Sequence, residues 1–130
     1  MADTDSLAPK VAEFIKLVEA AQTVEAIERF YAPDVIVFEN RKQERAGRDA
    51  CIAYEKEQLA DVAGKPTIKV VASAINEATG QVFLEYSIRF VSVSGREMLL
   101  EEVASQRWEG GLIVQERFYY QGFVDESGPL

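Results

Sequence analysis

The spacing of apolar residues differs between the first and second halves of this chain of 130 residues, and this difference constrains the fold most. Up to about residue 62, apart from one short apolar run at 35–38, the apolar residues recur every three or four positions, which is typical of helices with one buried face. From Thr67 onward they alternate with polar residues, which is typical of half-buried strands. Helices followed by a run of strands predict an α+β fold.

Three helices are predicted in the first half. The first carries one apolar stripe from Leu7 to Ala21. The second begins at Thr23, whose hydroxyl would cap it by accepting an early backbone N–H, and Pro33 would stop it. The third covers 49–62 and is ended by the Gly-Lys-Pro segment at 64–66.

Strands are predicted in the remaining segments. A short buried strand at 35–38 follows the second helix, and a polar loop leads from it to Gly47. Glycine-containing breakers divide the second half into an antiparallel meander of strands near 67–76, 81–93, 96–108 and 112–121. Strands of this length should twist and curve strongly. The polar tail at 125–130 is expected to be frayed.

Composition excludes several kinds of site. The chain has no histidine, so it cannot by itself form a Ser-His-Asp triad, a Cys-His pair or an imidazole metal cluster. Its single cysteine, Cys51, excludes an internal disulfide and a cysteine zinc site, and packing is its expected role. The net charge of −8 and the scattered basic residues argue against nucleic acid and membrane surfaces as partners.

The chain is expected to be a soluble, cytoplasmic protein with a single domain over 1–130. Its length is that of one compact domain. The first ten residues lack the basic start and apolar stretch of a secretory signal. No later segment approaches the roughly 20 apolar residues of a membrane span.

Four short phrases, in this order and spacing, resemble the nuclear transport factor 2-like superfamily and its SnoaL-like group. They are IERFYAPDV at 27–35, GRDACIAY at 47–54, RW at 107–108 and GLIVQERFYY at 111–120. The resemblance covers about residues 7–121. It implies a cone in which three helices close a curved antiparallel sheet around one mostly apolar cavity, commonly in a homodimer. It implies less about chemistry, because this fold hosts isomerases, cyclases, hydrolases, dehydratases and noncatalytic modules.

Alternate residues of a curved strand point into the cone. On strand 81–93 the apolar set points inward, whereas the two faces of strand 96–108 are nearly balanced. Resemblance to ketosteroid isomerases favours the set with Glu102 inside. The predicted pocket lining is Phe14, Val37, Ile88, Phe90, Glu102, Ala104, Gln106, Trp108, Glu116 and Phe118.

Glu39 is the predicted general base. It ends the first strand, where the resemblance to ketosteroid isomerase places a catalytic aspartate. Aromatic walls would desolvate its carboxylate and raise its pKa toward the range needed for proton transfer at neutral pH. Tyr54, Tyr86 or Tyr120 would then donate a hydrogen bond to a developing oxyanion.

The chain also departs from its relatives. The helix tyrosine of the isomerases falls on Phe14 or Ile15, and their second aspartate falls on Ala104. The SnoaL-like cyclases and the limonene epoxide hydrolases would call for an aspartate at Phe118. Neither polyketide cyclisation nor epoxide opening is therefore predicted.

Three carboxylates, Glu39, Glu102 and Glu116, are expected to project inward and to repel one another. A divalent cation could hold them, but no motif spacing supports a metal. Pairing of one acid with an arginine is favoured, and the candidates are Arg41, Arg107 and Arg117.

Two functions remain open. One is a cofactor-independent acid–base enzyme, of isomerase, cyclase or dehydratase type, that acts on a hydrophobic carbonyl compound with Glu39 as base. The other is a noncatalytic module that binds a small hydrophobic ligand or dimerises through its sheet. Neither a metal nor an organic cofactor is predicted.

Overall fold

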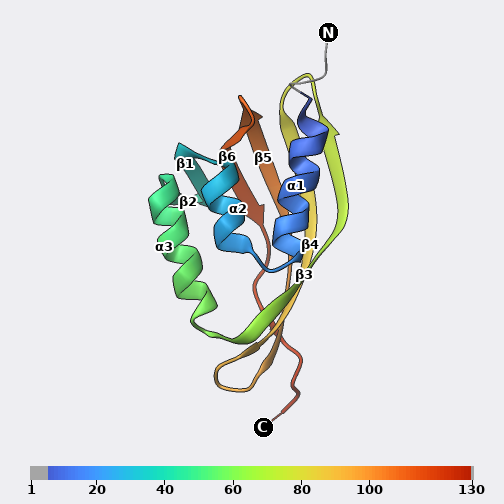
Figure 1. Ribbon diagram of the computed structural model, residues 1–130. Coiled ribbons are helices and arrows are strands. Elements are labelled where there is room, and N and C mark those ends of the chain that lie inside the picture. Colours follow the sequence, from blue (N-terminus) through green and yellow to red (C-terminus); the bar gives the residue numbers. More distant parts are fainter. Residues whose placement is uncertain (1–5, 130) are drawn as a thin grey trace.

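The structure is a computed structural model that describes residues 6–129 (Figure 1). Residues 1–5, on which the expectation about the start of the chain partly rests, and Leu130 lie outside the described residues. Three helices pack along one side of a curved sheet. They are α1 (Leu7–Glu19), α2 (Thr23–Phe30) and α3 (Arg48–Leu59). No helix within 6–129 has the length and apolar character needed to span a membrane.

The sheet is mixed. Its strands are β1 (Tyr31–Glu39), β2 (Lys42–Ala46), β3 (Val62–Asn76), β4 (Gln81–Ser92), β5 (Glu97–Glu109), β6 (Leu112–Tyr119) and β7 (Val124–Asp125). They lie in the order β2-β1-β6-β5-β4-β3, and β7 pairs with β5. The predicted antiparallel meander is confirmed for β3 to β6. The predicted α+β fold of three helices and a curved sheet is confirmed, but the sheet is not antiparallel throughout as predicted, because β1 pairs with β6 in parallel.

The first helix follows its predicted stripe. Its buried side chains are Leu7, Val11, Phe14, Leu17 and Val18. Its N-cap residue, Ser6, makes no capping hydrogen bond through its side chain. Instead Glu77, from the β3–β4 turn, accepts hydrogen bonds from the backbone N–H groups of Leu7 and Ala8 at 2.9 and 3.0 Å. These bonds satisfy donors that helix geometry leaves open and tie the helix to the sheet.

The second helix differs from the prediction at its start. Gln22, not Thr23, occupies the N-cap position. The Thr23 hydroxyl donates a hydrogen bond to the Glu55 carboxylate of α3 at 2.7 Å. The predicted capping role of Thr23 is therefore wrong, since its side chain joins two helices.

The second helix ends at Phe30, before Pro33. Tyr31 already has the extended backbone of β1. Pro33 lies inside this strand, where the pairing of β1 with β6 is interrupted between Tyr31 and Ile36. Proline has no N–H to donate, so an interruption of the ladder accommodates it.

The strand β2 was missed, because Lys42–Ala46 is polar and was expected to be loop. It forms a hairpin with β1 through Asn40, whose φ of 54° lies in the left-handed region that asparagine tolerates. An exposed edge strand has no apolar alternation to reveal it.

The third helix is shorter than predicted, and β3 begins earlier. Leu59 ends the helix, and Val62 is already paired with Ser92. The Gly-Lys-Pro segment at 64–66 interrupts the register of β3 with β4 instead of separating two elements.

The tail was expected to be frayed, but residues 125–129 are tethered. Val124 and Asp125 pair with β5. Arg96 binds Asp125 at 2.7 Å, and Arg89 forms an ion pair with Glu126.

Candidate functional site

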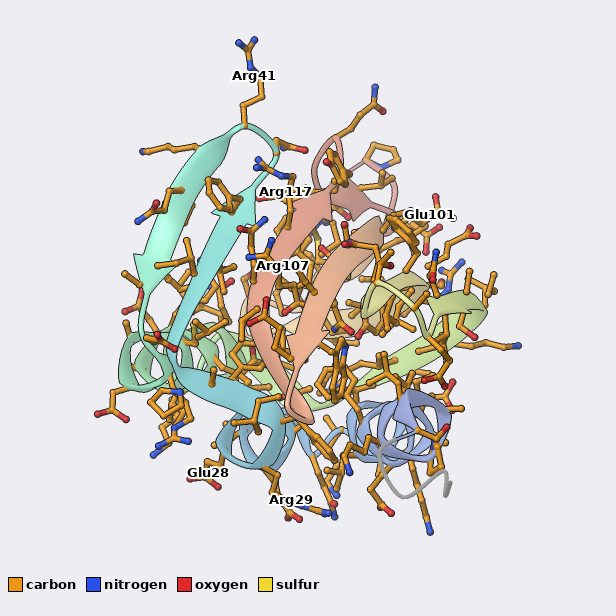
Figure 2. The ribbon with its side chains drawn as sticks, turned by 90° about the horizontal axis from the view of Figure 1, so that it is seen from above. Glu28, Arg29, Arg41, Glu101, Arg107 and Arg117 are labelled. Carbon is orange, nitrogen blue, oxygen red and sulfur yellow. The ribbon has the colours of Figure 1, made fainter. Side chains whose placement is uncertain are left out.

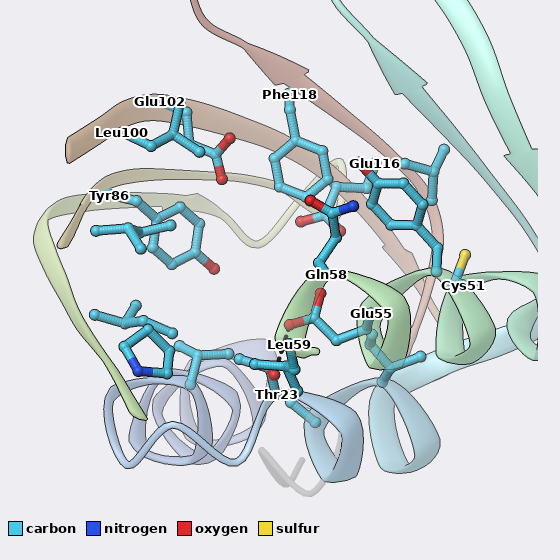
Figure 3. Close-up of a pocket in the computed structure, with 18 of the residues that line it drawn as sticks. Thr23, Cys51, Glu55, Gln58, Leu59, Tyr86, Leu100, Glu102, Glu116 and Phe118 are labelled. Atoms are coloured by element: carbon cyan, nitrogen blue, oxygen red, sulfur yellow. Dashed lines mark hydrogen bonds between the residues drawn. The ribbon is translucent and has the colours of Figure 1, made fainter. Parts of the chain in front are cut away.

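A cavity of about 240 Å³ lies between the helices and the concave face of the sheet (Figure 3). Its walls are mostly apolar and aromatic. It is formed by all three helices, by strands β1 to β6 and by the segment after β6. The predicted site residues that line it are Phe14, Val37, Glu39, Tyr54, Tyr86, Ile88, Phe90, Glu102, Glu116, Phe118 and Tyr120.

Three residues predicted to line the pocket lie outside it, namely Ala104, Gln106 and Trp108. Their side of β5 is the buried one, as the resemblance implied, but they sit deeper in the core. The Trp108 ring packs against Phe14 and Phe30, with ring centroids 6.1 and 5.7 Å apart. The helices therefore cover this end of the strand and exclude it from the cavity.

A buried polar network connects two residues of the cavity wall, Tyr31 and Glu116, to Gln106 and Trp108 in the core. The Trp108 indole N–H donates to Gln106 at 2.9 Å, and the Gln106 amide donates to Glu116 at 2.7 Å. The Tyr31 hydroxyl donates to the other Glu116 oxygen. Burial raises the pKa of Glu116, and the hydrogen bonds from Tyr31 and Gln106 oppose that rise. Each member of the network has a partner, so the network fixes Glu116 in place.

Glu39 lies at the end of β1 and is paired. The Arg45 guanidinium binds its carboxylate at 2.7 Å, and the Tyr120 hydroxyl donates to it. The Arg45 guanidinium also stacks on the Tyr54 ring, 3.8 Å from its centroid. Burial favours a higher pKa for Glu39, but the hydrogen bonds from Tyr120 and Arg45 and the Arg45 charge outweigh burial and lower the pKa. The predicted rise of this pKa is wrong.

The partner of Glu39 is none of the arginines that were predicted. Arg41 projects away from the molecule at the β1–β2 turn (Figure 2). Arg107 pairs with Glu109 at 3.5 Å, and Arg117 donates to the Asn40 carbonyl. Arg45 was missed because β2 was read as a loop. The β1–β2 hairpin places Arg45 opposite Val37, and the polar sequence of β2 gives no signal of this pairing.

Glu102 differs from Glu39 in that its carboxyl group has no partner within the described residues. It lies on β5 directly opposite Tyr86 of β4, and no hydrogen bond or ion pair within residues 6–129 involves its side chain. Burial, followed by the charges of Glu116, Glu39 and Glu55, raises the pKa of Glu102 to about 8. The protonated form therefore dominates at neutral pH.

The Tyr86 hydroxyl is a second group in the cavity without a partner. The side chain is only 6% exposed, and no hydrogen bond to its hydroxyl is found within the described chain. Figure 3 shows the hydroxyl pointing into the cavity. Burial and nearby carboxylates raise the pKa of Tyr86 well above its usual value, so the group remains a hydrogen-bond donor.

Family comparison identifies the domain. The sequence profile of the SnoaL-like domain matches residues 11–116. The chain belongs to the SnoaL-like family. No significant match is found among curated proteins.

Solved structures share the fold of this SnoaL-like chain. A candidate SnoaL-like polyketide cyclase from Mesorhizobium loti is 21% identical, with 88% of this chain and 99% of that chain covered and a TM-score of 0.73. An NTF2-like protein of unknown function from Burkholderia pseudomallei is 17% identical, with 93% and 92% covered and a TM-score of 0.73. A candidate isomerase from Bacillus subtilis is 12% identical, with 93% and 90% covered and a TM-score of 0.72. Such low identities establish the fold alone.

Residues that differ from the catalytic residues of similar enzymes line this SnoaL-like cavity. Phe118 lines it at the position where the resemblance calls for an aspartate, and Phe14, one of the two positions on which the isomerases' tyrosine falls, lines it as well. Cys51 also lines it, and burial raises the pKa of its thiol, which disfavours the reactive thiolate. Within residues 6–129 no three His, Cys, Asp or Glu side chains are arranged to hold a metal ion.

Proposed function

We propose that this SnoaL-like chain is a cofactor-independent acid–base enzyme that acts on a small hydrophobic carbonyl compound, with Glu102 as the group that moves the proton. The observation that carries the proposal is an unpartnered carboxyl of raised pKa inside an apolar cavity. A general base or acid works best when its pKa lies near the working pH. Glu39 is less suited to transfer the proton, because Arg45 and Tyr120 bind its carboxylate.

The neighbouring groups suggest how the reaction would run. The ionised Glu102 carboxylate removes a proton from the carbon beside the carbonyl. The Tyr86 hydroxyl donates a hydrogen bond to the oxygen on which negative charge develops, which replaces the oxyanion donors that related isomerases use. Glu102 then returns the proton to the same carbon or to a conjugated carbon. These two proton transfers need no further reactant.

The test measures proton abstraction directly. Cyclohexanone and cyclohexenone are incubated with the protein in D₂O, and exchange of the hydrogens beside the carbonyl is followed by NMR. Glu102→Gln should lower the exchange rate by at least about 100-fold, the usual contribution of a general base. Glu101→Gln is the matched control, because Glu101 is the adjacent acid on β5 and is exposed (Figure 2).

Two results would overturn the assignment. Loss of exchange in Glu39→Gln, with exchange retained in Glu102→Gln, would return the role of base to Glu39. Binding of these ketones without any exchange would favour the alternative, a noncatalytic ligand-binding module.

We further propose that the chain forms a homodimer through the outer face of β4, β5 and β6. Phe83, Val103 and Tyr119 are 45%, 38% and 51% exposed on this face. Val103 is paired directly with Tyr119, and Phe83 lies on the next row of the sheet. An exposed apolar patch of this kind is typical of protein interfaces. Sedimentation should give a dimer mass that Phe83→Glu reduces to a monomer, whereas Val93→Glu, at the β4–β5 turn, should not.

A further inference from the structure

The charges that face the cavity are unbalanced. Four carboxyl groups line it, namely those of Glu39, Glu55, Glu102 and Glu116. Arg45 is the single lysine or arginine among the lining residues within 6–129, and it is already paired with Glu39. The ion pairs of the described chain include none of the other three acids.

Two of these three acids, Glu55 and Glu116, have neutral hydrogen-bond partners. Thr23 donates to Glu55, and Tyr31 and Gln106 donate to Glu116. Glu102 has no partner within residues 6–129, and the charges of Glu116, Glu39 and Glu55 act on it. Ionised carboxylates in a mostly apolar cavity repel one another strongly, because the low local dielectric screens them poorly. Burial and this repulsion together account for the proton that Glu102 keeps at neutral pH. A cation bound among them would relieve this repulsion.

We propose that the cavity selects an organic cation, in which an apolar body carries a protonated amine that Glu55 binds across from Glu102. Figure 3 shows the Glu55 and Glu102 carboxyl groups projecting into the cavity from opposite walls, α3 and β5. The unpartnered Tyr86 hydroxyl, on a side chain more than nine-tenths buried, also points into this space. This inference rests on the proposed function and adds a positive charge to the substrate class.

A bound metal ion fits these residues less well than an organic cation. Oxygen ligands of Mg²⁺ or Ca²⁺ must approach within about 2.0–2.6 Å of one ion. No group of three acids within residues 6–129 is gathered in that way. An alkyl or cyclic ammonium reaches a single carboxylate and fills the apolar space with its carbon atoms. Aromatic faces such as Phe118 add a favourable contact with the positive charge.

The test compares three ligands of matched shape: cyclohexylammonium, cyclohexanol and cyclohexanecarboxylate. Binding is measured by titration calorimetry at pH 7 in 0.15 M salt. Cyclohexylammonium should bind at least about tenfold more tightly than cyclohexanol, because a charge pair in a poorly screened site outweighs a neutral hydrogen bond. Equal affinity of the two, or tightest binding of the carboxylate at Arg45, would overturn the proposal.

A variant pair separates the cavity from the general negative charge of the protein. Glu55→Gln keeps an acceptor for Thr23 and should reduce the preference for the ammonium severalfold without weakening cyclohexanol. Glu57→Gln removes the same charge from an exposed position of the same helix and should leave the preference intact. Equal losses in both variants would overturn the proposal by assigning the preference to long-range attraction.

Binding is measured without turnover, so the two proposals fail separately. Retained ammonium preference in a protein that exchanges no ketone hydrogens contradicts only the catalytic role of Glu102. Normal exchange without ammonium preference contradicts only the cationic substrate class.

Discussion

Two carboxyl groups that line the cavity, Glu39 on β1 and Glu102 on β5, are in opposite states. Glu39 is held by Arg45 and Tyr120, and its pKa is lowered. Glu102 has no partner within the described chain, and its pKa is raised to about 8. Burial acts in the same direction on both carboxyl groups.

The difference between them lies in their neighbours. Donors and a cation surround Glu39, whereas Glu102 faces apolar walls and other acids. A pKa therefore reports the balance between desolvation and specific partners, not depth alone. The lowered pKa suits a structural ion pair, and the raised pKa suits a group that exchanges a proton.

The largest expected effect is on the pH dependence of stability. Between pH 4.5 and about 8 the folded protein keeps a proton on Glu102 that the unfolded chain has lost. The free energy of unfolding therefore falls as pH rises through this window, by up to about 5 kcal/mol if the whole shift acts. Glu102→Gln removes this fall. In urea unfolding at pH 5, 7 and 9, the free energy of unfolding of the variant should increase relative to that of the natural protein as pH rises.

The matched control for this measurement is Glu101→Gln. Its stability should run parallel to that of the natural protein, because its carboxyl is exposed. Glu116 keeps its raised pKa in all three proteins, so only the differences between curves are interpreted. Parallel curves for Glu102→Gln would contradict the raised pKa.

Much of the fold was predictable because it follows from local pattern. The periods of 3.6 and two residues predicted α1 and the β3–β6 meander, since α1 has a buried stripe, β4 buries alternate residues, and β3 alternates between partly buried and exposed residues. The edge strand β2 carries no such signal, because its side chains are mostly exposed. The parallel pairing of β1 with β6 joins distant segments, and no local pattern encodes it.

The candidate site was predictable in membership but not in electrostatics. The parity of the strands brings Glu102, Glu116 and Phe118 to the concave face. The state of Glu39 depends on Arg45, which arrives through the missed strand β2. Sequence pattern alone thus identified three of the four acids in the cavity, missed Glu55 on α3, and assigned the raised pKa to the wrong acid.

The second prediction removes the cationic partner of Glu39, so that its carboxyl group resembles that of Glu102 in having no ion pair. Arg45→Met removes the cation from a pair whose side chains are only 11% and 18% exposed. Removing one partner of a largely buried pair costs about 3 kcal/mol, because the other charge stays desolvated. Urea unfolding at pH 7 should show this loss, and Glu39→Gln in the same chain should recover part of it.

Arg41→Met is the control on the same hairpin. Arg41 is exposed and projects away from the molecule, so stability should not change measurably. An equal loss in both variants would assign the effect to the hairpin and not to the ion pair.

The smallest effect comes from the hydroxyl that completes the Glu39 site. Tyr120→Phe removes one hydrogen bond to this carboxylate and should cost about 1 kcal/mol at pH 7. Because the pKa of folded Glu39 is lowered, its contribution is present above pH 4.5 and is lost as pH falls through the folded value. The deficit of the variant should therefore shrink between pH 5 and pH 3 in urea unfolding. Tyr119→Phe, at the exposed neighbouring position, should show no deficit, and a Tyr120→Phe deficit unchanged down to pH 3 would contradict a bond to the ionised carboxylate.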